Sequence, residues 1–157
     1  MKTASFINMC YYLLALISGA AVTTQVGING KLLVNIGGPI LTSFISFLVG
    51  TIVLAIAYIL AVYYGLEPIP TFNAMTQTSL WLWMGGVLGA FYIFTTILCS
   101  PKIGFANMFS LLVAGQIILA IIFDHFGLLG SSVHLISPLR FIGVILLIVS
   151  VYLIQTN

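Results

Sequence analysis

Charged residues are what this sequence has fewest of. They make up 4% of its 157 residues, whereas a soluble domain uses roughly a quarter. The six charged residues are scattered along the chain: Lys2, Lys31, Glu67, Lys102, Asp124 and Arg140. So few charges cannot cover a surface that faces water, which excludes an ordinary soluble domain. The net charge of +2 is also too small and too dispersed for a nucleic-acid-binding surface, so we expect no nucleic-acid partner.

Motifs for enzyme chemistry are also missing. His125 and His134 are not spaced as metal ligands, no carboxylates are paired for acid–base catalysis, and no serine has an evident base. There is no glycine-rich phosphate loop, so any energy that the protein uses would come from a gradient and not from a bound nucleotide. We therefore expect no enzymatic activity, no metal and no cofactor. Cysteine is scarce too: Cys10 and Cys99 are expected near opposite membrane faces, most of about 30 Å apart, which excludes a disulfide within one subunit.

Long apolar runs are what the sequence has in abundance, since 62% of its residues are hydrophobic. A helix needs about 20 mostly apolar residues to cross a bilayer. Five runs meet this length, at about residues 6–25, 40–64, 80–99, 103–124 and 138–154. The first run resembles a cleavable signal peptide, but four more runs follow it, so we expect a membrane helix. The sequence predicts an all-α polytopic membrane protein, a single domain of five transmembrane helices.

The cations favour neither orientation in the membrane. With five spans, Lys2 and Arg140 lie on one side and two other lysines, Lys31 and Lys102, on the opposite side, so the positive-inside rule gives a tie. One interpretation is that the first helix alone sets the orientation, or that one cation lies too deep to count. The other is that the chain inserts both ways and forms an antiparallel homodimer, with the inverted symmetry of secondary transporters. The charge count leaves both open.

Polar residues inside the spans are candidates for solute binding, because polar groups are costly in a bilayer. In the first span, spacings of seven, seven and four residues place four of them on one helical stripe: Tyr11, Ser18, Gln25 and Asn29. The carboxamides of Gln25 and Asn29 can donate hydrogen bonds to a solute and accept them. Alternatively, they cap the helix end and satisfy backbone groups around the nearby glycines.

The third span carries a second stripe. Gly85 and Gly89 form a small-xxx-small pair, which predicts close packing of another helix or a dimer contact. Tyr92 and Thr96 continue the stripe and are candidates for solute binding, since the Tyr92 ring can hold an organic cation. The alternatives are a helix that bends at its glycines and a hydrogen-bonded core tyrosine.

The fourth and fifth spans add further candidates. Gln116 and Asp124 are two four-residue steps apart, so they face the same way. We expect Gln116 to bind solute and Asp124, the only acid in a span, to couple transport to protons or cations. The alternative for Asp124 is structural, because it lies near the helix end and can pair with Arg140 or a loop histidine. Gly143 and Ser150, seven residues apart, predict helix packing or a dimer contact.

Several stretches are similar to the YdcZ-like family of small bacterial membrane proteins. They follow the family's order over nearly the whole chain: residues 25–32 (QVGINGKL), 38–39 (GP), 43–50 (SFISFLVG), 85–92 (GGVLGAFY), 100–104 (SPKIG), 115–116 (GQ) and 124–130 (DHFGLLG). The resemblance implies a five-helix member of the drug/metabolite transporter superfamily, in the bacterial inner membrane and related in plan to the small multidrug resistance proteins. It also implies dual-topology single genes, opposite-oriented pairs or fused tandem forms, so the expected partner is a second copy or an opposite-oriented paralogue.

The resemblance carries over only some site residues. Small multidrug resistance proteins couple to protons through a glutamate in their first helix, and this first span has no acid, so their mechanism does not transfer. The resemblance favours Gln25, Asn29, Gln116 and Asp124. The expected function is a secondary transporter that exports a small organic solute by alternating access in a dual-topology dimer. The alternatives are a dual-topology ion channel and a non-transporting accessory subunit.

Overall fold

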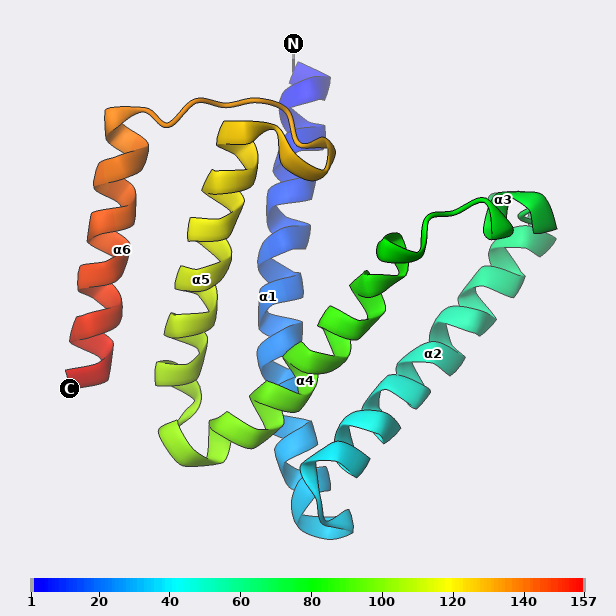
Figure 1. The fold of residues 1–157 in the computed structure, drawn as a ribbon, viewed down its shortest axis with the longest axis horizontal. Helices are drawn as coiled ribbons and strands as arrows, with labels where there is room; N and C mark the ends of the chain where they lie inside the picture. Colours follow the sequence, from blue (N-terminus) through cyan, green and yellow to red (C-terminus); the bar gives the residue numbers. More distant parts are fainter. Residues whose placement is uncertain (1, 157) are drawn as a thin grey trace. The chain divides into compact units, whose positions relative to one another are not determined.

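The computed structural model describes the backbone of residues 2–156 and the side chains of residues 7–156, and this part of the chain is all-α (Figure 1). Its elements in chain order are α1 (Lys2–Ile36), α2 (Pro39–Tyr63), α3 (Phe72–Thr76), η1 (Leu80–Trp83), α4 (Met84–Ile103), α5 (Phe105–Phe126), η2 (Leu128–Gly130) and α6 (Pro138–Thr156). The side chain of Lys2, one cation of the charge tie, lies outside the described residues.

Five stretches are long and apolar enough to cross a membrane. They are Ile7–Ile36, Pro39–Tyr63, Leu80–Ile103, Phe105–Phe126 and Pro138–Thr156. The predicted all-α architecture with five membrane-capable helices is therefore confirmed.

The first helix runs well past residue 25, to Ile36. The hydroxyls before residue 25 bond within the helix, since Ser18 donates to the carbonyl of Leu14 at 2.9 Å and Thr24 donates to that of Ala20 at 2.9 Å. At about 1.5 Å per residue, a helix this long exceeds the thickness of a hydrocarbon core. The segment that carries the carboxamides is therefore helix interior and not a helix end.

Glycines in the left-handed region separate the long helices. Gly37 and Gly38, with φ of 68° and 72°, end α1 before Pro39 begins α2. Helix α4 continues through Pro101, although the third predicted span ends at residue 99, and the chain turns at Gly104 with φ of 81°. Glycine tolerates this backbone conformation because it has no Cβ.

Contacts within the chain define two compact units, one ending at Leu98 and one beginning at Cys99. In the first unit α1 packs against α2, and in the second unit α5 packs against α6 and η2. The buried apolar side chains are Val26, Ile93, Ile97, Met108 and Val151. Most of the other large apolar side chains are exposed, as expected of helices whose solvent is lipid.

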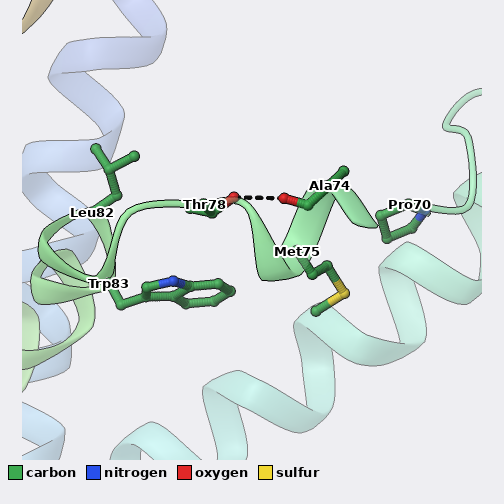
Figure 2. Close-up of a pocket in the computed structure, with 6 residues that line it drawn as sticks. All are labelled: Pro70, Ala74, Met75, Thr78, Leu82 and Trp83. Carbon is green, nitrogen blue, oxygen red and sulfur yellow. Dashed lines mark hydrogen bonds between the residues drawn. The ribbon is translucent and has the colours of Figure 1, made fainter. Parts of the chain in front are cut away.

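The long loop before α4 folds into a small structure of its own. Thr71 caps α3 by accepting a hydrogen bond from the Ala74 amide at 3.3 Å, and Thr78 donates to the Ala74 carbonyl at 2.8 Å. The Trp83 indole and the Met75 side chain lie on either side of a shallow pocket of about 360 Å³ (Figure 2). Tryptophan at the start of a membrane-capable stretch suits the headgroup region of a bilayer.

Candidate solute-binding groove

A groove of about 530 Å³ lies between α1 and α2 in the first unit. Both of its walls come from membrane-capable helices, and small residues in each wall leave the space open. It is lined by Ala21, Thr24, Gln25, Ile28, Asn29, Leu32, Ile45, Ser46, Val49 and Gly50. Because Gly50 stands close to the midpoint of α2, the groove reaches the middle of that span.

The structure brings Gln25 and Asn29 to this groove from successive turns of α1, as their four-residue spacing predicts. Gln25 Nε2 donates to Ser46 Oγ on α2 at 3.4 Å. That distance is at the long end for a hydrogen bond, so this contact is weak and easily exchanged for another partner. Ser46 was not predicted, since the sequence does not show which turn of α2 faces α1.

Asn29 stands out among the groove residues. Its side chain is 4% exposed, and its Nδ2 is buried without a hydrogen-bond partner among the described residues. An unpaired buried donor costs about 1–3 kcal/mol and is rare in folded proteins. The alternative in which these carboxamides cap the helix end is not what the geometry shows, because α1 continues to Ile36 and the Gly37 amide bonds to the Leu33 carbonyl at 2.9 Å.

Tyr92 and Thr96 do not line this groove. Thr96 is fully buried, and its hydroxyl donates to the Ile93 carbonyl of its own helix at 2.8 Å. Tyr92 is half-buried one turn earlier on α4.

The two glycines of the α4 stripe differ in their surroundings. A Cβ built at Gly89 would lie 3.4 Å from Cζ of Phe47 on α2, whereas one at Gly85 would meet nothing within 4 Å in the described part of the chain. Of these two glycines, only Gly89 lies close to another helix in the described part of the chain.

A second groove, of about 640 Å³, lies between α2 and α4 in the same unit. Half of its lining residues are aromatic: Phe44 and Phe47 come from α2, and Phe91 and Phe94 come from α4. Sequence reasoning missed these residues, although each pair is spaced by three positions and so shares a helix face. This spacing could have predicted two aromatic helix faces.

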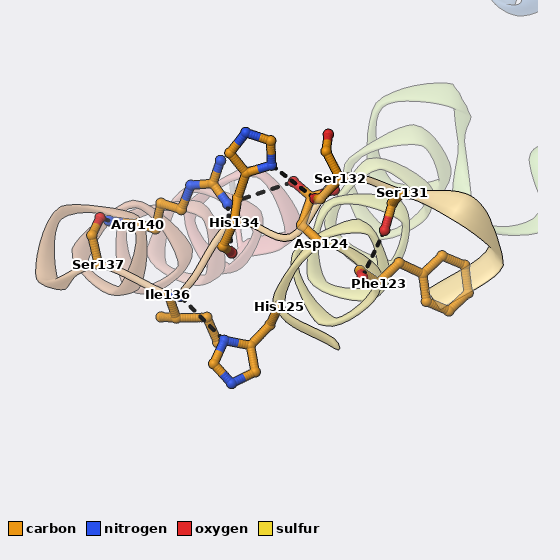
Figure 3. A network of polar contacts seen from close by, with 9 residues as sticks. All are labelled: Phe123, Asp124, His125, Ser131, Ser132, His134, Ile136, Ser137 and Arg140. Carbon is orange, nitrogen blue, oxygen red and sulfur yellow. Dashed lines mark hydrogen bonds and ion pairs between the residues drawn. The ribbon is translucent and has the colours of Figure 1, made fainter. Parts of the chain in front are cut away.

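Asp124 is held in a network at the end of α5. Its Oδ2 lies 3.5 Å from Arg140 Nη1 on α6, and each side chain is 38% exposed. The same arginine nitrogen donates to the His134 carbonyl at 3.4 Å, and the His134 amide donates to the Asp124 carbonyl at 2.8 Å (Figure 3). Nearby, the Ile136 amide donates to His125 Nδ1 at 3.2 Å. These bonds tie the α5–α6 loop to both helices, which favours the structural alternative for Asp124.

The surroundings of the other three predicted residues, Gln116, Gly143 and Ser150, do not show a binding site or a helix contact among the described residues. Gln116 is exposed on α5 and lines neither of the two grooves. Ser150 donates its hydroxyl to the Leu146 carbonyl at 2.8 Å, and a Cβ at Gly143 would meet nothing within 4 Å among the described residues. The dimer contact predicted for Gly143 and Ser150 stays a prediction.

Comparison with known proteins identifies the family. A family model described as "Putative inner membrane exporter, YdcZ" matches residues 10–153. Among curated proteins and solved structures, none matches the chain. The match covers nearly all of the sequence and agrees with the five membrane-capable helices. The protein is a multi-pass inner-membrane protein, and it belongs to the YdcZ family, a transporter-like family and not an enzyme family.

Proposed function

We propose that the protein is a secondary transporter that exports a small organic solute across the inner membrane, and that the α1–α2 groove binds this solute. The observation that carries the proposal is the groove itself. It places two carboxamides and a serine hydroxyl inside two membrane-capable helices, where polar groups mark solute pathways. The family description supports the direction of transport, since it names an exporter.

The groove has the size and composition of a small-molecule site. Such sites are mostly apolar clefts of about 300–1,000 Å³ with a few placed polar groups. The groove holds Gln25, Asn29 and Ser46 among apolar neighbours. Secondary transporters also bind their solutes near the bilayer midplane, and this groove reaches the middle of the membrane-capable helix α2.

We also propose that the working unit is an inverted pair of chains that alternates access around this groove. Three features support it: the tie among the cations, the five membrane-capable helices of the described residues, which cannot form two equal halves, and large exposed apolar helix faces. A second copy in the opposite orientation supplies the two-fold axis in the membrane plane that inverted-repeat transporters use. A reporter fused to the C-terminus should then be found on both sides of the membrane. Detection on one side only, with no opposite-oriented partner, contradicts the inverted pair.

The transport proposal is tested with purified protein in liposomes. Saturable solute flux driven by a proton gradient is the expected result. Rapid ion current that does not saturate would instead favour the dual-topology channel. Neither flux nor current would favour an accessory subunit.

A further inference from the structure

We infer that the α1–α2 groove selects uncharged solutes that carry a hydrogen-bond acceptor, such as an amide carbonyl, and that Asn29 is the residue that binds this acceptor. The inference rests on the proposed function and specifies the class of solute that the groove would carry.

The donor is the first line of support. Asn29 lines the groove and is 4% exposed, and its Nδ2 is buried without a partner among the described residues, so an acceptor reaches this nitrogen when the side chain turns toward the groove. The Thr24 hydroxyl beside it donates to the Ala20 carbonyl at 2.9 Å, and Gln25 Nε2 makes a weak 3.4 Å contact with Ser46 Oγ, so Asn29 Nδ2 is the donor of this groove that has no partner among the described residues. An amide nitrogen can only donate, so the group that completes this site must be an acceptor. A buried donor is seldom left unpaired in a finished site.

The charge of the groove is the second line. None of its ten described lining residues is charged. Lys31 stands two positions after Asn29 on α1, and residues two apart on a helix do not face each other. A charged solute would therefore enter a span without a counter-ion, at a large desolvation cost. Apolar side chains such as Ile28, Ile45 and Val49 suit the hydrocarbon part of an uncharged solute.

The test uses three probes that share a benzene ring and differ in head charge: benzamide, benzoate and benzyltrimethylammonium. Binding is measured by the thermal shift of the purified protein in lipid nanodiscs. We expect benzamide alone to stabilise the wild-type protein. Asn29→Ala should weaken benzamide binding roughly 10-fold, the effect of one lost hydrogen bond. Asn29→Asp, which replaces the donor by a carboxylate oxygen, should shift preference to the cation.

The matched control is Asn107→Ala on α5, because Asn107 Nδ2 already donates to the Ile103 carbonyl at 3.0 Å. This variant should bind benzamide as the wild type does. The inference is overturned if no probe binds, if a charged probe binds the wild type as well as benzamide does, or if Asn29→Ala leaves benzamide binding unchanged. Saturable flux of benzyltrimethylammonium that is insensitive to Asn29→Ala would support the proposed transport function and contradict the inference that the solute is uncharged. Asn29-dependent benzamide binding without saturable flux of any solute would support the inference about the solute class and contradict the proposed transport function.

Discussion

Replacing Asn29 by alanine should make the folded protein more stable. The wild-type side chain holds a buried donor with no partner among the described residues, at a cost of about 1–3 kcal/mol. Alanine removes that donor, and it is also a better helix former by about 0.5 kcal/mol. Because the side chain borders an open groove, its shortening leaves no closed cavity. We expect a net gain of about 1.5–3.5 kcal/mol in the free energy of unfolding.

The assay is reversible unfolding of the protein in bicelles. The free energy of unfolding is obtained from the fraction of protein that is trapped in the unfolded state. Asn107→Ala is the matched control, since it deletes a carboxamide that already donates to the Ile103 carbonyl at 3.0 Å. That variant should change stability by no more than about 1 kcal/mol, and in the destabilising direction. Gain of stability with loss of solute binding is typical of a residue kept for function.

A clear loss of stability in Asn29→Ala would refute this reasoning. It would mean that the Asn29 amide is bonded in the folded protein, for example by a second copy of the chain. The unpaired donor would then not be a solute contact.

Three further predictions concern the rest of the chain. Asp124→Asn should cost about 0.2–1 kcal/mol of stability, because its ion pair with Arg140 is solvent-screened, and should leave proton-linked flux intact; loss of proton dependence in a folded variant would restore the coupling role. Gly127→Ala should destabilise by about 1–3 kcal/mol in the same unfolding assay, since Gly127 has φ of 63° and an added Cβ would lie 2.8 Å from Val133 Cγ2; equal stability to wild type contradicts this. An inverted pair places Cys10 of one copy and Cys99 of the other at similar depth, so mild oxidation should give a crosslinked dimer on a gel; its absence would count against that geometry.

The length of the apolar runs was sufficient to predict the spans, and periodicity was sufficient to predict one wall of the groove. The apolar runs gave five helices, and the four-residue step from Gln25 to Asn29 placed both carboxamides on one face of α1. The length of α1 was underestimated, because a stretch rich in threonine, glycine and amide residues is typical of a helix end. In the structure the threonine hydroxyls bond back to the helix, and the helix continues through the glycine and amide residues to Ile36.

The opposite wall of the groove could not be predicted. Nothing in the order of α2 residues shows that Ser46 faces Gln25, because that pairing depends on how the two helices pack. The burial of Thr96 was hidden for the same reason. The ion pair of Asp124 was easier to predict. Asp124 lies near a helix end and only 16 residues before Arg140, so the sequence already offered this pair as an alternative.

The central claim is that the groove between α1 and α2 carries a solute across the membrane. Solute flux into three matched liposome preparations tests this claim most directly. Wild-type, Asn29→Ala and Asn107→Ala proteins would be reconstituted at equal density, and proton-driven uptake of benzamide measured against its concentration. The account predicts saturable uptake by the wild type and by Asn107→Ala, with half-saturation roughly 10-fold higher in Asn29→Ala. Identical uptake curves for all three proteins, or no saturable uptake at all, would contradict it.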